Sequence, residues 1–361
     1  MKKLLFIVFC LFLYSTFAWA ETFTTRQALS DDETFTVDSG DTYYYDGDKV
    51  IDAIGHSNVT VTNNGNIIAH ATDGSPTELI HCGSGCDDTI DASSSVNFTL
   101  TNNGTIWAGH ARTIDLKNAT GNITLTNNAD AKIAAGERLG GYDVLDLDGA
   151  GSSGDTITIV NHGAIENIAR NWNVIGLASI DNGAIVNFTN TGTITLGTDT
   201  FGDKNKYYGG VVATDSTDEI NFNNSGTMQS ARLIFRLGGT TNFTLTNSGT
   251  IKQYNYANHG VSDSNAGTWY TYSTIAVGDS GSGATIINSG TISASHQNNH
   301  GITIGDNDAN EAHSNATIEN SGTISAGSDD FARAIIIIPS ESGTITSGTT
   351  IKVKGEAEFT G

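Results

Sequence analysis

Short alternations of apolar and polar residues recur along most of the chain, and each ends in the same kind of pentapeptide. The pentapeptide reads Asn-Ser-Gly-Thr-Ile at 247–251, 288–292 and 320–324, and variants bring the number of copies after residue 55 to nine. The positions two and four before each Asn are apolar in every copy, and polar residues such as Thr lie between them. A period of two with one apolar face predicts a half-buried β-strand.

In eight copies a Gly stands two residues after the Asn and predicts a bend, after which a second short strand carries the Ile. The copy at Asn127 is irregular, with Ala129 in place of this Gly and its Ile at 133. The Asn lies on the same inward face of the strand as the apolar residues two and four positions before it. Asparagines stacked in register can therefore hydrogen-bond to the copies above and below. We expect the Gly to supply a positive φ at the turn. The predicted ladder consists of Asn63, Asn102, Asn127, Asn161, Asn190, Asn224, Asn247, Asn288 and Asn320.

A third short apolar strand precedes each alternation, for example at Val50-Ile51, Leu79-Ile80 and Thr113-Ile114. The motif returns every ~32 residues, a period typical of stacked repeats. One such unit cannot bury its own apolar face, whereas a stack of units can. The pattern therefore predicts an all-β fold: a parallel β-helix of about ten coils of three short strands with an inward Asn ladder.

The chain begins with the pattern of a secretory signal peptide. Lys2 and Lys3 precede the apolar run Leu4–Leu13, and Ala18-Trp19-Ala20 has the small-x-small form of a cleavage site. The apolar run is too short to span a bilayer, and no later stretch is long enough either. We expect residues 1–20 to be removed after export and the mature chain to contain no transmembrane segment.

The next segment, residues 21–49, differs from the repeats. It has no Asn, carries eight acidic residues and contains the run Tyr43-Tyr44-Tyr45. An uncovered first coil would present an open strand edge, so we interpret 21–49 as a charged N-terminal cap. A ligand-binding tip is the alternative. The repeat domain is then 50–361.

The composition agrees with a repeat array, and the net charge excludes one class of partner. The chain has 361 residues, among them 48 Thr, 42 Gly, 34 Asn and 2 Pro, which excludes both a mainly helical protein and collagen. The formal net charge is −22. Phosphates would be repelled by this charge, so nucleic acid is not an expected partner.

Over about residues 50–351, the repeated Asn-Ser-Gly-Thr-Ile text after a signal peptide resembles the passenger domains of bacterial autotransporters (type V secretion). The resemblance implies a right-handed β-helix that is displayed on, or shed from, the outer membrane surface of a Gram-negative cell. It also implies a C-terminal β-barrel translocator. Because the 361 residues contain no such barrel, we expect the sequence to be incomplete at its C-terminus, with export by another route as the alternative.

Two groups of residues suggest specific chemistry. Cys82 and Cys86 are the only cysteines after the leader, and in an oxidising compartment we expect a disulfide between them, with free thiols as the alternative. Aromatic residues crowd the longest loops, where they could either stack on neutral glycans or cover the outer wall of the coils. They are Tyr207, Tyr208, Tyr254, Tyr256, Trp269, Tyr270 and Tyr272.

Charged residues give a weaker signal. Asp146, Asp148 and Asp155 surround a glycine-rich loop that could bind calcium, but no calcium-loop motif accompanies them, so we expect solvated side chains and no cofactor. Arg112, like Arg232 and Arg333, stands two residues before a strand isoleucine. We expect these arginines to pair with surface aspartates.

No set of residues in the sequence has the pattern of a catalytic site. The favoured function is therefore a non-enzymatic, secreted or surface-displayed adhesin-like stalk. Its partners would be a host or environmental glycan or a protein receptor. A β-helical carbohydrate-active enzyme, either a polysaccharide lyase or a glycoside hydrolase, is the alternative. Another is a spacer for an effector or barrel that lies beyond residue 361.

Overall fold

The computed structural model describes most of the repeat region. The residues described are 20–45, 48–69, 88–109, 111–136, 143–167, 173–177, 183–197, 210–214, 219–230, 233–237, 242–253, 273–277, 284–295, 299–304, 317–327, 332–337 and 350–353. These residues form strands, bends and turns and contain no helix.

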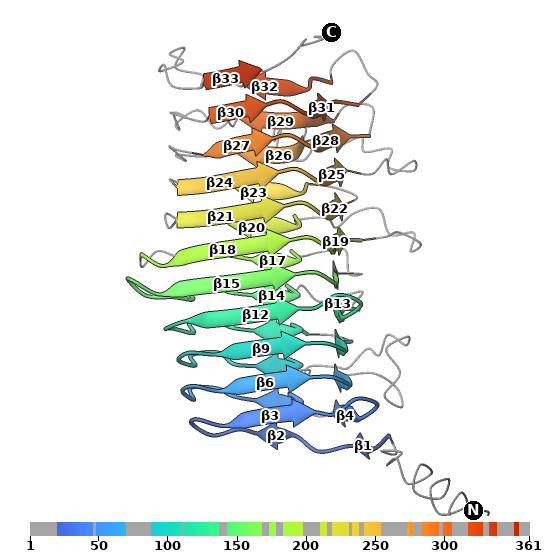
Figure 1. Cartoon of the computed structure of the whole chain (residues 1–361), viewed down its shortest axis with the longest axis vertical. Helices are drawn as coiled ribbons and strands as arrows, with labels where there is room; N and C mark the ends of the chain where they lie inside the picture. The colour runs from blue at the N-terminus through green and yellow to red at the C-terminus, as the bar shows by residue number, and fades with distance from the viewer. Residues whose placement is uncertain are drawn as a thin grey trace, which may run out of the picture.

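The strands stack into three parallel sheets, and each turn of the chain adds one strand to each sheet (Figure 1). Sheet A contains β1 (Thr22–Phe23), β4 (Thr42–Tyr45), β7 (Asn66–Ala69), β10 (Thr105–Ala108), β13 (Lys132–Ala135), β16 (Ala164–Asn167), β19 (Thr193–Leu196), β22 (Thr227–Ser230), β25 (Thr250–Gln253), β28 (Thr291–Ala294) and β31 (Thr323–Ser325).

Sheet B contains β2 (Gln27–Ala28), β5 (Ile51–Asp52), β8 (Ile90–Asp91), β11 (Ile114–Asp115), β14 (Leu145–Asp146), β17 (Ile175–Gly176), β20 (Val212–Thr214), β23 (Phe235–Leu237), β26 (Ser273–Val277), β29 (His300–Ile304) and β32 (Ile335–Ile337). The third strand of this sheet is β8, which pairs directly with β5, whereas the predicted Leu79-Ile80 lies outside the described residues. Ile90-Asp91 takes that place because it repeats the Ile-Asp pair of the coils on either side of it.

Sheet C contains β3 (Thr34–Val37), β6 (Thr60–Asn63), β9 (Thr99–Asn102), β12 (Ile123–Asn127), β15 (Thr156–Asn161), β18 (Ile185–Asn190), β21 (Glu219–Asn224), β24 (Asn242–Asn247), β27 (Thr285–Asn288), β30 (Thr317–Asn320) and β33 (Thr350–Val353). The nine strands from β6 to β30 are the alternations found in the sequence, whereas β3 and β33 were not predicted, and neighbouring strands pair in register. The predicted parallel β-helix is confirmed.

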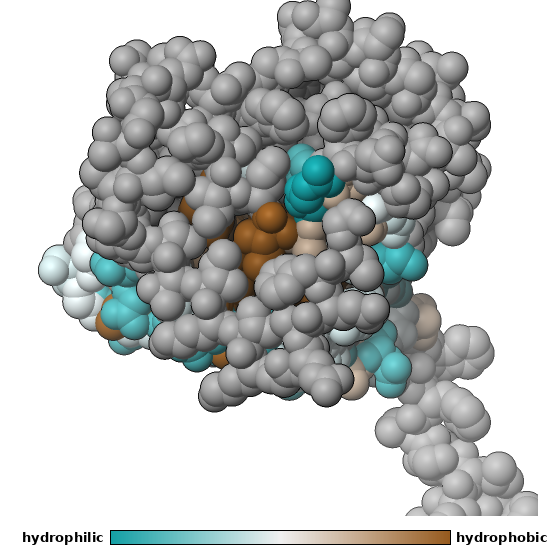
Figure 2. All heavy atoms as spheres, turned by 90° about the horizontal axis from the view of Figure 1, so that it is seen from above, coloured by the Kyte–Doolittle hydropathy of each residue, from teal (hydrophilic) through white to brown (hydrophobic). Residues whose placement is uncertain are grey.

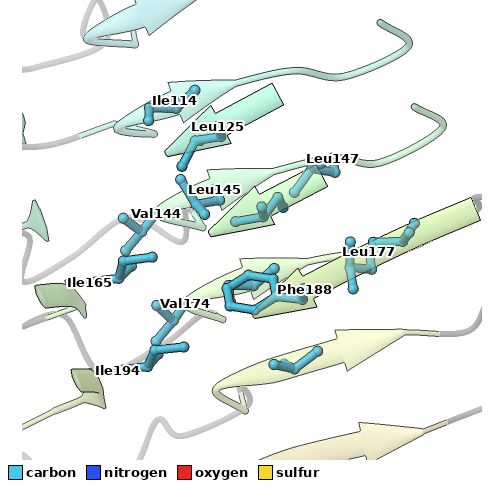
Figure 3. Packing of buried hydrophobic residues seen from close by; sticks show 14 of the residues in the cluster. Ile114, Leu125, Val144, Leu145, Leu147, Ile165, Val174, Leu177, Phe188 and Ile194 are labelled. Carbon is cyan, nitrogen blue, oxygen red and sulfur yellow. The ribbon is translucent and has the colours of Figure 1, made fainter. Parts of the chain in front are cut away.

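One continuous apolar core runs through the stack. Side chains at equivalent positions lie one coil apart, as with Val144 above Val174 and Ile165 above Ile194 (Figure 3). Phe188 and Phe222 stack face to face with ring centroids 4.4 Å apart. The core is thus built of columns in which like side chains pack on like, which keeps the register from slipping.

The segment predicted to be a cap forms the first coil. Strands β1, β2 and β3 are the terminal strands of sheets A, B and C, so residues 21–49 continue the same helix. Phe23 stacks on Tyr43 at 4.4 Å, and Phe35 meets Tyr43 edge-on. These rings pack at the N-terminal end of the core, where Phe35, Tyr43 and Tyr45 are partly buried. The protective role of this coil stays a prediction.

The opposite end of the rod is seen in Figure 2, viewed from above. A group of hydrophobic residues is visible near the middle of this face, with a hydrophilic group at its upper right and further hydrophilic residues at the edges. Ile324 and Ile335, from β31 and β32, are partly buried against the last part of the core. Apolar surface therefore lies inside the coil and polar surface outside it.

Candidate functional site

The nine predicted asparagines form an unbroken internal ladder at the bend between sheets C and A. Each Nδ2 donates to the Oδ1 of the next asparagine toward the C-terminus, over 2.7–2.8 Å at every step. Eight of the nine side chains are buried, and Asn320 at the end is partly so. Many of the Nδ2 groups also donate to backbone carbonyls of the bend, such as the Thr105 carbonyl at 3.1 Å from Asn63. The ladder is confirmed, and its role is structural because its hydrogen-bonding groups are directed at one another.

The glycine that follows each asparagine has a different role from the one predicted. The motif glycines are not among the residues with positive φ. Instead, a Cβ at Gly226 would lie 2.1 Å from the Gly192 carbonyl oxygen, and the other coils repeat this conflict. The bends stack so closely that no side chain fits between them, so close approach of the backbones requires the glycine.

A second column of polar residues lies on the outer face of sheet B. Asp52, Asp91, Asp115 and Asp146 are aligned on successive strands β5, β8, β11 and β14. Three of them are only 3–6% exposed. In the next coil Gly176 takes the position, and the Asp143 carboxylate lies against it, 1.9 Å from where a Cβ would be. The column therefore ends after four carboxylates.

The Oδ1 atom of each aspartate in this column fixes a turn. It accepts a hydrogen bond from the backbone N–H two residues later, as with Ser93 on Asp91 at 3.1 Å and Lys117 on Asp115 at 2.8 Å. Asp146 holds the Asp148 N–H at 3.0 Å in the same way. These are Asx turns, which lead the chain out of sheet B into the next bend.

The Oδ2 atoms face cations, most of them from the preceding coil. Arg26 pairs with Asp52, and Lys49 Nζ lies 2.9 Å from Asp91 Oδ2. Arg112 serves three carboxylates: it contacts Asp146 through Nε, and its Nη1 lies 3.6 Å from both Asp88 and Asp115. Arg112 pairs with aspartates as expected, but these aspartates are buried and not at the surface, and Asp146 belongs to this network rather than to a solvated loop.

Carboxyl groups in this network do not all ionise alike. Burial, reinforced by the nearby Asp115 charge, raises the pKa of Asp88 to about 8, and Asp88 donates a hydrogen bond to Asp115. Burial, with Asp146 nearby, raises the pKa of Asp143 to about 7. Burial opposes the charge of Arg112, but the surrounding carboxylates outweigh it and raise the Arg112 pKa. At neutral pH Asp88 is therefore mostly protonated, while Arg112 keeps its charge.

Two chemistries are open to such a cluster in principle. Carboxyl groups with different pKa values beside an arginine can act as acid and base on a sugar. Clustered carboxylates can also bind a cation, but no group of three or more His, Cys, Asp or Glu in the described ranges could hold a metal ion. Each column carboxylate already uses one oxygen in its turn and the other toward a cation, which favours a structural role.

Other predicted site residues fall outside the described ranges. They are Cys82, Cys86, Tyr207, Tyr208, Tyr254, Tyr256, Trp269, Tyr270 and Tyr272. The leader, residues 1–19, lies outside as well. No helix among the described residues is long and apolar enough to cross a membrane.

The aspartate column was not predicted from the sequence. Its signal was available, because an Ile-Asp or Leu-Asp pair occurs at 51–52, 90–91, 114–115 and 145–146. The assignment of Leu79-Ile80 as a strand hid the second pair. Comparisons with models of known protein families, with curated proteins and with solved structures found no match to this chain.

Proposed function

We propose that this protein is a non-enzymatic β-helical stalk, exported by its leader and displayed on, or shed from, the surface of a Gram-negative cell. The proposal rests on the resemblance of its repeats to autotransporter passengers. Its partners are then an outer-membrane translocator during export, and a glycan or protein receptor afterwards. In this proposal the rod holds a binding region away from the cell.

The observation that supports the proposal best is the continuity of the Asn ladder. Eight amide-to-amide hydrogen bonds link nine coils without a gap. Each step between coils adds about 4.8 Å, so the eleven coils make a rod of about 48 Å from the first to the last. A rod held by one core and one ladder resists bending, which is the mechanical property that a stalk needs.

Export and display can be tested on cells that carry the full-length gene. N-terminal sequencing of the surface protein should give Glu21 as the first residue, and protease added to intact cells should degrade it. A protein that keeps residues 1–20, or that resists protease until the cells are lysed, would contradict display.

Absence of catalysis can be tested separately. Residues 21–361, with calcium, should release neither unsaturated nor reducing ends from pectate, alginate or neutral glycans. A formal charge of −22 over the chain repels anionic polysaccharides, which is one reason for this expectation. Release of product would favour the alternative enzyme.

The alternative, a carbohydrate-active enzyme, is favoured by one observation. Asp88 donates to Asp115 beside Arg112, so a protonated carboxyl group and a carboxylate lie together on the outer wall. If turnover is found, Asp88→Asn and Asp115→Asn should each abolish it without loss of fold. Asp130→Asn, at an exposed bend, is the matched control and should leave turnover unchanged.

A further inference from the structure

The outer face of sheet C carries a regular array of threonines in its N-terminal half. Each of the strands β3, β6, β9 and β12 presents two outward threonines, and neighbouring strands pair them in register. Strands β15 and β18 continue the two columns with Thr158 and Thr189. The twelve positions are Thr34, Thr36, Thr60, Thr62, Thr99, Thr101, Thr124, Thr126, Thr158, Val160, Asn187 and Thr189.

The array is neutral on a strongly acidic protein. Ten of its twelve positions are Thr, and none is charged, although the chain carries a net charge of −22. The outer face of sheet B, by contrast, presents four stacked aspartates over the same coils. A surface without charge fits a partner without charge, because ions on either side would lose hydration for no gain.

The hydroxyl groups of the array are available to such a partner. All ten threonines are half-exposed or exposed, and none of their hydroxyls hydrogen-bonds to another residue in the described ranges. Threonine is branched at Cβ and has few rotamers on a strand, so its hydroxyl and methyl groups repeat with little freedom. Little conformational entropy is therefore lost when a partner binds.

The distances between the outward threonines indicate which kind of partner fits the array. Adjacent strands lie about 4.8 Å apart, and outward residues along one strand are separated by about 6.7 Å. Hexagonal ice repeats its water oxygens at distances close to both spacings. From the match of spacing, neutrality and unpaired hydroxyls we propose that this threonine array binds the surface of ice. The hydroxyls would hold water at lattice positions, and the methyl groups would fill the hollows between them.

A crystalline neutral glycan is the other regular surface to consider. Binding of sugar rings generally uses aromatic side chains as stacking platforms, but the twelve positions of the array include no aromatic residue. Small side chains on a flat sheet suit a lattice of water molecules better. In Figure 1 the strands of sheet C lie one above another and run in the same direction, as a planar array requires.

The test uses residues 21–361 in an ice recrystallisation assay and in partition into a growing ice hemisphere. The wild type should slow crystal coarsening and enter the ice. Thr101→Lys places a long cation in the middle of the array, so about tenfold more protein should be needed for the same inhibition. Thr250→Lys, on the outer face of sheet A beside Lys252, is the matched control and should behave as wild type.

Circular dichroism and thermal unfolding of both variants show whether the fold is kept. Failure of the wild type to inhibit recrystallisation would overturn the proposal, and so would equal loss in the two variants when both are folded. Retention on crystalline cellulose or chitin that Thr101→Lys abolishes, without any effect on ice, would also overturn it and assign the array to glycan. None of these results bears on export or display, so the stalk proposal stands or falls separately.

Discussion

Two polar columns run along this rod, and they differ in length. The inner one repeats asparagine through nine coils, whereas the outer one repeats aspartate through four and then stops at Gly176. An amide carries both a donor and an acceptor, so it can pair with a copy of itself without limit. A carboxylate only accepts, and stacked carboxylates repel each other unless cations lie between them. Arg26, Lys49 and Arg112 provide those cations. A column of asparagine amides can therefore extend along the whole stack, whereas a column of aspartates extends only as far as cations lie beside it.

The strongest test of this difference puts a charge into the inner column. Asn190→Asp replaces the Nδ2 donor that now reaches Asn224 Oδ1 at 2.7 Å with an oxygen that faces another oxygen. We expect a loss of about 3–5 kcal/mol in the free energy of unfolding at pH 7, and a smaller loss at pH 4, where the new carboxyl is protonated. Chemical unfolding at the two pH values measures it. Asn122→Asp, at an exposed bend, should change stability little, and a similar loss there would contradict the explanation.

Removing a cation from the outer column is the converse test. Arg112→Met leaves Asp88, Asp115 and Asp146 without their shared partner. We expect a loss of about 3 kcal/mol at pH 8 and a smaller one at pH 5, because protonation relieves the repulsion. Arg236→Met on β23, whose side chain is exposed, should cost little. Equal losses at both pH values would mean that packing of the arginine stem, not its charge, matters.

Truncation of single asparagines tests how far the ladder acts as a unit. Asn190→Ala, in the middle, leaves Asn161 and Asn224 each without one partner, at about 1–3 kcal/mol. Asn63→Ala, at the end, should cost less because Asn63 has a ladder neighbour on one side only. Thermal unfolding measures both. Equal and negligible effects would show that the ladder contributes nothing.

The last test concerns the proton held by Asp88. With a pKa raised to about 8, the folded protein binds a proton that the unfolded chain releases near pH 4. This group therefore makes the protein less stable as pH rises from 4 to 8. Asp88→Asn should remove that part of the decline, so its stability relative to wild type should rise by up to about 4 kcal/mol between pH 5 and pH 8. Stability curves for both proteins measure it, and Asp130→Asn should follow the wild type. Parallel curves for Asp88→Asn and wild type would show that the carboxyl ionises normally.

Much of the fold could be predicted from the sequence, because most coils repeat the same alternation of apolar and polar residues followed by an Asn. The alternation before each Asn and the Asn itself gave sheet C, the bend and the ladder, and even the irregular copy at Asn127 places Ile133 in register with Ile106 and Ile165. The motif glycine was predicted for the wrong reason, a positive φ instead of close backbone approach. The distance between stacked coils cannot be read from the sequence of one coil. The outer column was missed because its cations stand at different offsets in each coil, and only the stacked structure brings Lys49 to Asp91.

The ladder also has a direction, which bears on how such a rod can begin. Every amide donates toward the C-terminus, so the first asparagine has a spare acceptor below it and not a spare donor. Asn63 Oδ1 takes the Gly65 N–H at 3.2 Å, and its register partner in the first coil is Val37, which has no polar group to offer. A chain that emerges N-terminus first can thus complete its initial coil with local bonds alone. The asparagine of each later coil then meets the free Nδ2 donor of the coil before it, so coils can be added one at a time from the N-terminal end.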